Sequence, residues 1–576
     1  MKPLFIGYGE DGERITLTEK DLETHLHGIG ATRTGKSKMI EWIARELIRT
    51  GQGFCLIDPH GFLYNDLLRW LAYAQRDREV VLFNPSYDRR VVGFNPFRSQ
   101  TGDIGTLVDR RLKATLKVWG STNANETPRL ERWLRAFYHV LIEQGYSLDV
   151  ARYLFTFRHK QIREYLAHSI RSELIRNEFE ELSEYTKLRE FMDQVESTKN
   201  RLFRFLAPQQ VRRVVGLETN NINLEEIIER GQVLLINLQP SDTLDAEHAR
   251  LIGTLFLNEF WEVARRRQQT ATGANPSDFF LVIDEFQEFL TPDISTMLDQ
   301  AAKYGIHLML FHQRLSQLKE LDPQAFGAIN NAQLKLVYGG LSDEDAQLMV
   351  RAIFPGQIDL KRVKFLIEQT KFWPRVGRAN VRSSSDTTGR SQGNMSGGSS
   401  GTVLGASSGV SLGPDWPGSH DITMFDGTSR SEISSSSDSS FDSTSESRTE
   451  GEVDVPFIYP EAFTEVSSLT AYSLEEQLWE LASQLREQYQ RHFMIRRPGK
   501  STIAGVTPFV KPYKTDPEDV TIYIEKCLKG FLTPLEVDRA LLNIHDRLRL
   551  AAGAVQEIDP TDSDNIWEKP LDKEGV

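Results

Sequence analysis

The chain is poor in cysteine and lacks long apolar runs, and each lack excludes a class of protein. Cys55 and Cys527 are the only cysteines among 576 residues, and no CxxC or Cys/His spacing surrounds them, which argues against a disulfide framework or a structural zinc site. No uninterrupted apolar run approaches the roughly 18 residues of a membrane-spanning helix, and the N-terminus lacks the pattern of a signal peptide. We therefore expect a cytoplasmic protein without an intrinsic membrane span, recruited to a membrane only through a partner.

Basic residues are also outnumbered, with 68 Lys and Arg against 81 Asp and Glu and a formal net charge of −13. Such a balance is unusual for a nucleic-acid-binding protein, which normally presents a basic surface. The charge is unevenly distributed, because residues 103–215 hold 20 basic against 15 acidic side chains. These basic residues are either ordinary solvated helix faces or a nucleic-acid surface, and the sequence leaves both open. The candidates for DNA phosphate contacts are Arg110, Arg111, Lys113, Lys117, Arg212 and Arg213.

The order of apolar segments predicts an α/β fold with a mainly parallel sheet. Short apolar runs alternate with amphipathic segments over residues 26–98 and again over 232–338, and the runs are almost continuously apolar, as in strands covered on both faces. Between them, residues 103–215 have the pattern of helices throughout. We therefore expect residues 1–102 and 216–380 to be two parts of one α/β domain, interrupted by an all-helical insertion over 103–215.

The C-terminal third has a different composition. Residues 383–451 contain 22 Ser and 11 Gly among 69 positions, which predicts a disordered linker. Residues 452–576 are expected to form a small, mainly helical region that ends in an acidic tail, and no chemistry can be assigned to it.

A complete phosphate-binding motif lies between the first predicted strand of the α/β pattern and the helix after it. The residues are Gly30, Ala31, Thr32, Arg33, Thr34, Gly35, Lys36 and Ser37, which match GxxxxGK[ST]. In such a loop the glycines let backbone N–H groups approach phosphates, the lysine reaches the β and γ oxygens, and the serine hydroxyl ligates Mg²⁺. This motif predicts binding of ATP and Mg²⁺.

Acidic residues at the end of a later strand indicate hydrolysis as well as binding. In FFLVIDEF, Asp284 would hold the Mg²⁺ shell and Glu285 would polarise the attacking water. Gln313 follows the next strand and could contact the γ-phosphate or that water. The alternative for each is a polar residue that merely ends a strand. His60, after LIDP, is as compatible with a structural turn as with catalysis.

Several of these segments together resemble the HerA–FtsK superfamily of P-loop motors. They are HLHGIGATRTGKS, LIDPHG, GFNPF, LLINL, LVIDEFQEF and KYGIHLMLFHQRLSQL, and their order is similar to that in soluble relatives of the TraG/TraD-type coupling proteins of type IV secretion and conjugation. The resemblance covers about residues 4–375. It implies a RecA-like ATPase domain, a ring of six subunits with ATP at the interfaces, and DNA translocation through the ring.

Carried over residue by residue, the resemblance makes Lys36 and Ser37 the Walker A phosphate and magnesium residues, Asp284 and Glu285 the Walker B pair, and Gln313 the sensor. One position departs from the pattern. Where the family often has Arg-Lys-x-Gly, this chain has Ala302, Lys303, Tyr304 and Gly305, so the arginine that would reach a neighbour's ATP is missing. Candidates for a substitute cation are Lys303, Arg314, Arg351 and Arg33.

Two functions remain in competition. The first is an ATP-driven DNA translocase that acts in conjugation-like transfer or mobile-element processing, with DNA and a relaxosome or secretion-channel protein as partners. The alternative is a nucleotide-gated ring scaffold that recruits an effector such as a nuclease in a defence or DNA-processing complex. A small-molecule P-loop kinase is disfavoured, because Glu285 and Gln313 suit water activation better than phosphate transfer to a metabolite.

Overall fold

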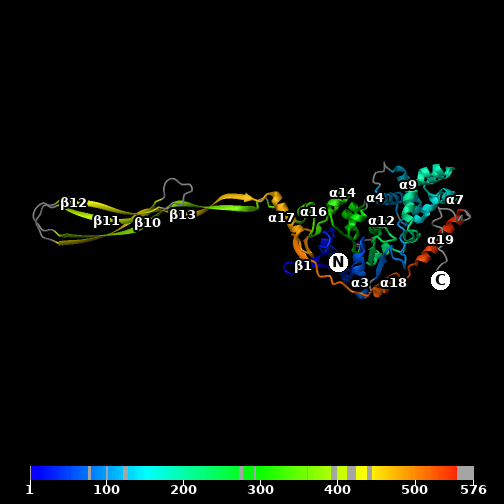
Figure 1. Cartoon of the computed structure of the whole chain (residues 1–576), viewed down its shortest axis with the longest axis horizontal. Coiled ribbons are helices and arrows are strands. Elements are labelled where there is room, and N and C mark those ends of the chain that lie inside the picture. The colour runs from blue at the N-terminus through cyan, green and yellow to red at the C-terminus, as the bar shows by residue number, and fades with distance from the viewer. Residues whose placement is uncertain are drawn as a thin grey trace. The chain divides into compact units, whose positions relative to one another are not determined.

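The computed structural model describes residues 2–74, 79–98, 102–120, 127–270, 277–290, 293–359, 361–390, 398–411, 423–436 and 444–553. They divide into two compact units. The main unit comprises residues 1–358 and 475–576, and the ribbon unit comprises residues 359–474. Figure 1 gives the order of the elements along the chain.

The main unit is built on one eleven-stranded sheet in the order β2-β1-β15-β14-β9-β3-β8-β7-β4-β6-β5. The strands from β9 to β5 run parallel to one another, and the other four add to the β9 edge in antiparallel pairs. The predicted mainly parallel sheet is therefore confirmed. Its strands are β1 (Leu4–Gly9), β2 (Arg14–Leu17), β3 (Leu26–Ile29), β4 (Gly53–Asp58), β5 (Val80–Phe83), β6 (Val233–Asn237), β7 (Phe279–Ile283), β8 (Ile306–His312), β9 (Leu334–Tyr338), β14 (His492–Arg496) and β15 (Ile503–Val506).

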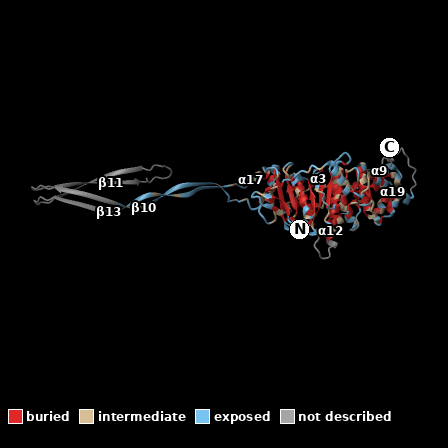
Figure 2. Cartoon of the chain, turned by 90° about the horizontal axis from the view of Figure 1, so that it is seen from below, coloured by how far each residue is buried: buried red, intermediate tan, exposed pale blue. Residues whose placement is uncertain are grey.

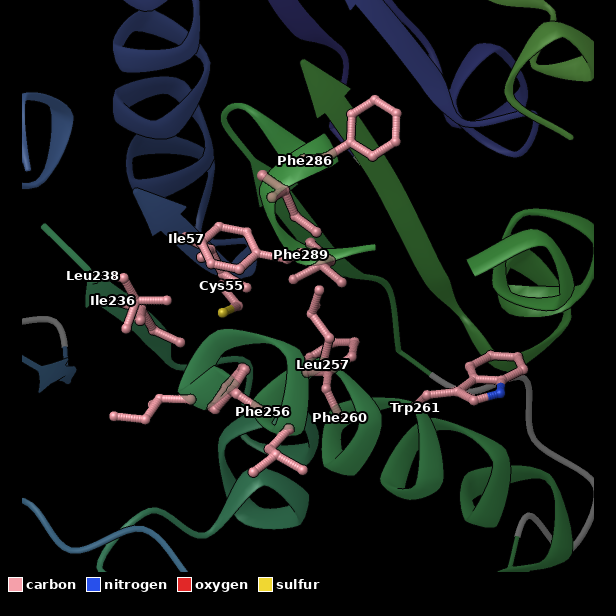
Figure 3. Close-up of a cluster of buried hydrophobic side chains, with 14 of the residues drawn as sticks. Cys55, Ile57, Ile236, Leu238, Phe256, Leu257, Phe260, Trp261, Phe286 and Phe289 are labelled. Carbon is pink, nitrogen blue, oxygen red and sulfur yellow. The ribbon is translucent and has the colours of Figure 1, made fainter. Parts of the chain in front are cut away.

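Helices cover the parallel part of the sheet, which explains why its strands are apolar on both faces. Cys55 and Ile57 of β4 are fully buried, and Figure 3 shows them in one cluster with Phe256 and Phe260 of the long helix α12. Burial of a large apolar side chain contributes about 1.5–3 kcal/mol, so such a cluster stabilises the packing of α12 on the sheet. The helices of the α/β core are α1 (Glu19–Leu22), α2 (Lys36–Thr50), α3 (Phe62–Ala74), α11 (Leu224–Glu229), α12 (Ala246–Thr270), α13 (Ile294–Gln300), α14 (Leu315–Leu321), α15 (Pro323–Asn331) and α16 (Asp343–Ile353), with the 3₁₀ turns η3 (Phe286–Phe289) and η4 (Ala301–Tyr304).

The insertion between β5 and β6 has only helices among its described residues, as the sequence predicts. Its buried residues include Trp133 of α5 and Phe179 of α8, whose rings lie 5.8 Å apart. Throughout the described part of the chain, no helix combines the length and apolar character needed to cross a membrane. The insertion contains α4 (Ile104–Val118), α5 (Pro128–Gln144), η1 (Leu148–Val150), α6 (Ala151–Leu154), η2 (Phe157–His159), α7 (Lys160–His168), α8 (Glu173–Glu184), α9 (Leu188–Leu206) and α10 (Gln209–Val215).

The region expected to be small and mainly helical over 452–576 contains three helices among its described residues, and it also adds two strands to the sheet of the main unit. The described residues from 475 onward belong to the main unit, where β14 pairs with β9 and β15 pairs with β1. Phe493 and Ile495 of β14 are completely buried, so this hairpin both extends the sheet and adds to its core. The helices that follow, α18 and α19, contact α3 and α10 respectively. The helices here are α17 (Leu474–Arg486), α18 (Pro517–Cys527) and α19 (Pro534–Ala551), and the predicted acidic tail lies outside the described residues.

The helix α19 is attached to the insertion by buried charges. His545 Nε2 lies 2.6 Å from Asp149 Oδ2, and Arg213 Nε donates to Asp538 Oδ1 at 2.8 Å. Asp149 is buried, but the nearby His545, Arg152 and Arg212 outweigh the effect of burial and hold its pKa below the usual range. Helix α19 and the insertion are therefore held together.

The described residues of the ribbon unit mostly form strands, and part of the linker expected over 383–451 lies outside the described residues. Its strands are β10 (Val363–Arg390), β11 (Gly398–Ser411), β12 (Thr423–Ser436) and β13 (Thr444–Ala471), with β10 paired to β13 and β11 to β12, both antiparallel. The segments that flank the Ser/Gly tract are rich in aromatic and β-branched residues, which favour strands. The pairing of β10 with β13 extends from these flanking segments into the Ser/Gly tract. Figure 2 shows that buried residues gather in the main unit, whereas the described side chains of β10 are mostly exposed.

Candidate functional site

The phosphate-binding motif forms the turn between β3 and α2. Gly35 has φ 116° and Arg33 has φ 67°, both in the left-handed region. A Cβ on Gly30 would lie 2.5 Å from Cβ of Tyr338, so only glycine fits against β9 there. Helix α2 begins at Lys36, and its N-cap, Gly35, has no side chain to bond the first amides. The N–H groups of this first turn are thus positioned to bind an anion.

The lysine of the motif meets the acidic pair that follows β7. Lys36 Nζ lies 3.2 Å from Asp284 Oδ1 and also forms an ion pair with Glu285. All three side chains are buried. The parallel order β3-β8-β7 brings the ends of these strands to the same edge of the sheet, which is why residues about 250 positions apart meet.

Glu285 is the most constrained member of the group. Its backbone has φ 47°, a left-handed conformation that is rare for a residue with a side chain. Gln287 donates to Oε2 at 2.7 Å, and Gln313 donates to Oε1 at 2.8 Å. Burial alone would raise the pKa of Glu285, but the charge of Lys36 and these hydrogen bonds outweigh it, so the net pKa is lowered and the carboxylate stays ionised.

Asp284 has the opposite tendency. Its pKa is raised to about 6, first by burial and then by the charges of Glu285 and Asp58, against the lowering effect of Lys36. Asp58 ends the neighbouring strand β4 and accepts the backbone N–H groups of His60 and Tyr64, each at 2.9 Å. Asp58 therefore shapes the turn after β4, and this role could have been inferred from its position before Pro-His-Gly.

A hollow of about 580 Å³ opens beside this group and is lined by residues that include His60, Glu285, Gln313, Arg314 and Glu344. Gln313 reaches two elements at once, because its amide donates to Glu285 while its side-chain amide oxygen Oε1 accepts the Thr32 hydroxyl at 3.0 Å. The structure thus brings together Lys36, Asp284, Glu285 and Gln313. Ser37 lies on the first turn of α2 with an exposed side chain, and His60 is exposed at the rim of the hollow.

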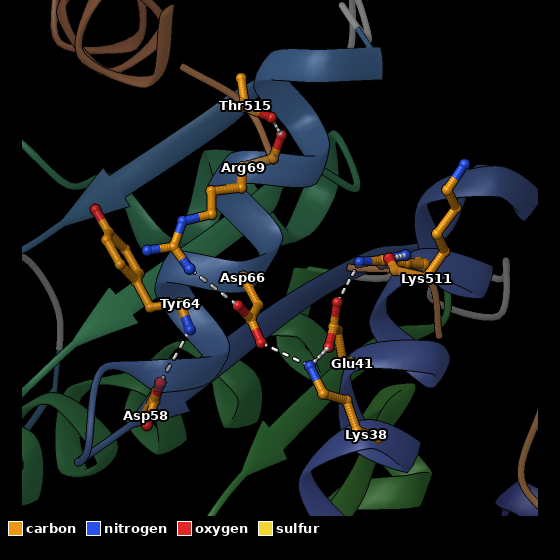
Figure 4. A network of polar contacts seen from close by, with 9 residues as sticks. Lys38, Glu41, Asp58, Tyr64, Asp66, Arg69, Lys511 and Thr515 are labelled. Carbon is orange, nitrogen blue, oxygen red and sulfur yellow. Dashed lines mark hydrogen bonds and ion pairs between the residues drawn. The ribbon is translucent and has the colours of Figure 1, made fainter. Parts of the chain in front are cut away.

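The helix that carries the motif is fixed by charges on its outer side (Figure 4). Lys38 Nζ donates to Glu41 Oε2 and to Asp66 Oδ2, each at 2.7 Å, and so joins α2 to α3. The Thr515 hydroxyl donates to the carbonyl oxygen of Arg69 at 2.8 Å, so the C-terminal segment is attached to α3 as well. None of these contacts was predicted, because they join segments whose spacing in the sequence carries no signal.

The predicted DNA contacts in the insertion are mostly engaged within the protein. Arg111 is 1% exposed, pairs with Glu259 and donates to the carbonyl oxygen of Pro96 at 2.5 Å, so its prediction as a phosphate contact is wrong. Lys113 is exposed. Of the other candidates, Arg110 pairs with Glu262, Lys117 with Asp322 and Arg213 with Asp538, and Arg212 is half-buried near Asp149. The number of lysines and arginines in this region therefore did not predict how many of their charges are free on its surface.

One protein-family model matches part of the chain. Residues 278–353 match the family model described as "TraM recognition site of TraD and TraG". This stretch runs from β7 through α16 and contains Asp284, Glu285 and Gln313. Over these residues the chain is similar to the TraG/TraD coupling proteins. The resemblance seen in the sequence is thereby confirmed.

Three solved structures are similar to the chain at low sequence identity. The unbound monoclinic form of the bacterial conjugative coupling protein TrwBdeltaN70 has 14% identity and a TM-score of 0.47, over 87% of this chain and 88% of that one. The plasmid coupling protein TrwB in complex with ADP and Mg²⁺ has 18% identity and a TM-score of 0.40, over 61% and 83%. VirB4 of Thermoanaerobacter pseudethanolicus has 12% identity and a TM-score of 0.36, over 61% and 87%. No curated protein matches the chain.

Proposed function

We propose that this protein binds ATP with Mg²⁺, hydrolyses it and uses the energy to move DNA. The observation that carries the proposal is the convergence of Lys36, Asp284, Glu285 and Gln313 beside a complete phosphate-binding loop. Phosphoryl transfer to water requires positioning and electrostatic stabilisation more than covalent chemistry, and these four side chains supply both.

Lys36 links phosphate binding to the activation of water. Its ammonium is shared between Glu285 and Asp284, so the phosphate oxygens of ATP must compete with these carboxylates for it. When Lys36 turns toward phosphate, Glu285 loses the charge that keeps its pKa low. Its carboxylate then becomes a stronger proton acceptor for the attacking water at the moment when the substrate is in place.

The remaining polar groups of the site fit a magnesium ion bound together with the phosphates. Ser37 has an exposed hydroxyl on the first turn of α2, and the Asp284 carboxylate is ionised above a pKa of about 6. Oxygen donors of this kind suit Mg²⁺, and when bound the ion would neutralise charge that develops on the phosphates. Gln313 orients the water through its contact with Glu285.

DNA movement and assembly into a ring, expected as a hexamer, are proposed from the family resemblance. The partners would be DNA, further copies of the chain, and a relaxosome, secretion-channel or nuclease protein. The test is the ATPase rate with and without single-stranded and double-stranded DNA, measured together with the native mass. DNA-stimulated hydrolysis by an oligomer, abolished in Lys36→Ala, is the expected result. Hydrolysis that is indifferent to both kinds of DNA would contradict translocation.

Glu285→Gln separates binding from chemistry in the same assay. The amide keeps the size of the side chain and removes the charge that polarises water, so ATP should still bind while turnover stops. Hydrolysis at the rate of the unmodified protein would show that Glu285 is not the base.

A nucleotide-gated scaffold is the second candidate, and the ribbon unit favours it. Phe365, Trp373 and Ile458 are exposed large apolar side chains on a two-stranded ribbon, and such surfaces commonly bind another protein. If the protein is a scaffold, ATP should change the protease protection of the ribbon, and DNA should leave ATP turnover unaffected. DNA stimulation together with unchanged protection would favour the translocase.

A further inference from the structure

We propose that Tyr489 and Phe509 form a nucleobase-binding surface beside the phosphate-binding loop, on which the base of the bound nucleotide stacks. The proposal rests on the nucleotide binding proposed above and adds where the other end of the nucleotide is held. Both residues belong to the C-terminal segment that adds β14 and β15 to the sheet.

The C-terminal segment contacts the loop directly. The backbone N–H of Arg491 donates to the carbonyl oxygen of Thr34 at 2.7 Å. A Cβ on Gly35 would lie 3.0 Å from Cα of Arg491, so the two backbones are as close as a glycine allows. The C-terminal segment therefore forms part of the wall of the loop.

Hydrogen bonds around Arg491 hold this contact rigidly. Arg491 has φ 71°, which is unfavourable for a residue with a side chain and persists only where neighbouring bonds impose it. Its guanidinium donates to the carbonyl oxygen of Thr507 from Nε at 3.1 Å and from Nη2 at 2.6 Å. The backbone N–H of Thr507 donates to the carbonyl oxygen of Arg491 at 2.9 Å. The Thr507 hydroxyl lies 2.7 Å from the hydroxyl of Tyr338 at the end of β9.

Two exposed aromatic rings flank this rigid turn. Tyr489 is 80% exposed and Phe509 is 70% exposed, although both sit beside a tightly bonded backbone. The Arg491 guanidinium lies over one face of the Phe509 ring, 5.7 Å from the ring centroid. Aromatic rings left open on a rigid backbone offer flat apolar faces, and stacking on such faces is how proteins commonly hold nucleobases.

The sheet order places this surface away from the hydrolytic groups. In the order β14-β9-β3-β8-β7, Glu285 and Gln313 follow β7 and β8 on one side of the loop strand β3, whereas Tyr489 and Arg491 precede β14 on the other side. A nucleotide whose γ-phosphate faces Glu285 and Gln313 extends away from them toward its base. The rings are therefore on the side where a base would lie.

The chemistry of the surface also predicts its selectivity. The guanidinium of Arg491 is already committed to Thr507, so the rings are left to provide the main interaction. Every base has a π face, and stacking discriminates weakly among bases. We expect ATP and GTP to bind with similar affinity.

The experiment measures binding of ATP, GTP and inorganic tripolyphosphate to the full-length protein and to Tyr489→Ala and Phe509→Ala. Stacking on an aromatic ring is commonly worth about tenfold in affinity or more, so each variant should bind both nucleotides about tenfold more weakly. Tripolyphosphate has no base, and its affinity should not change. Tyr489→Phe should keep the affinity for nucleotides, and Tyr165→Ala, in the insertion, serves as the matched control.

The outcomes separate this proposal from the proposed function. If the unmodified protein binds neither ATP nor tripolyphosphate, the function as an ATPase fails. If the unmodified protein binds ATP and both alanine variants bind it with the same affinity as the unmodified protein, the proposal of a nucleobase-binding surface is overturned, while the proposed ATPase function stands. Loss of tripolyphosphate binding in parallel with that of ATP would also overturn the surface, because it would show that the substitutions distort the loop.

Discussion

The hydroxyl of Thr32 donates to the side-chain amide oxygen Oε1 of Gln313 at 3.0 Å, and this bond joins the phosphate-binding loop to the end of β8. The amide of Gln313 also donates to Glu285 at 2.8 Å, so Gln313 connects the loop to the residue that would activate water. The three residues come from three different segments, so they form a route by which phosphate binding can reach β8.

The first prediction tests this route. Gln313→Ala should lower the ATP turnover number about 100-fold, as expected for loss of a group that positions the water. Thr32→Val should lower it only several-fold, because the glutamine keeps its bond to Glu285, and Thr32→Ser should restore it. Steady-state hydrolysis, with nucleotide binding measured in parallel, checks this. A Gln313→Ala enzyme with normal turnover would remove the residue from the mechanism.

The second prediction concerns the cost of keeping Asp284 charged. The pKa of this buried carboxyl is raised to about 6, so the folded state binds its proton more tightly than the unfolded chain does. Its contribution to stability is therefore full below about pH 4 and is lost as the pH rises through about 6. At neutral pH the ionised form costs up to about 3 kcal/mol.

Asp284→Asn should remove this cost. The free energy of unfolding in urea should be higher for the variant than for the unmodified protein at about pH 7.5, and the difference should shrink at about pH 4.5. ATP hydrolysis should be lost, because an amide is a poor magnesium ligand. A difference in stability that does not depend on pH would mean that the carboxyl titrates normally.

Much of the α/β core and the central site could be predicted from the sequence, because their signals are local. The apolar runs that became β4, β6, β7, β8 and β9 are nearly continuous, and the loop motif stands between a strand and a helix. The contribution of β14 and β15 was missed because edge pairing depends on partners far away in the chain. Phe493 pairs with Tyr338, which lies far away in the chain, and no short sequence pattern reveals such a pair.

Charge was harder to interpret than apolar pattern. A count of lysines and arginines predicts a surface only if the side chains reach solvent, and Arg111 does not. The ribbon shows a related limit, since the composition of the Ser/Gly tract hides the strand-forming flanks that pair Trp373 with Glu461.

The third prediction follows from the buried Arg111–Glu259 pair. Burial raises the pKa of Glu259, and the charge of Arg111 opposes that effect, so loss of the arginine would leave this buried acid with the longer contact to Arg266 at 3.9 Å. Arg111→Met should destabilise the protein by about 3–5 kcal/mol, whereas Arg111→Met with Glu259→Met should recover most of the loss. Urea unfolding measures both.

The exposed Lys113 is the matched control for that variant. Lys113→Gln should leave the free energy of unfolding within about 0.5 kcal/mol of the unmodified protein. If the insertion binds DNA, Lys113→Gln should also flatten the salt dependence of binding, because each phosphate contact adds to the slope. An unchanged slope would leave Lys113 as an ordinary surface charge.

The last prediction concerns the cation that would stabilise the γ-phosphate across a subunit interface. Ala302 occupies the position where an arginine was expected, and Lys303 beside it is exposed. Both lie in the 3₁₀ turn η4, where successive residues point about 120° apart, so a long side chain at 303 can compensate only in part for one at 302. Lysine also presents a point charge in place of the planar fork of arginine, which lowers the expected gain in rate below the roughly 10³ to 10⁵ of an arginine supplied in trans.

Subunits carrying Lys36→Ala, mixed with subunits carrying Lys303→Ala, should recover ATPase activity above that of either variant alone, because some interfaces then pair an intact loop with an intact lysine. Full activity of Lys303→Ala alone would exclude Lys303 and direct attention to Arg314, which lines the hollow beside Glu285.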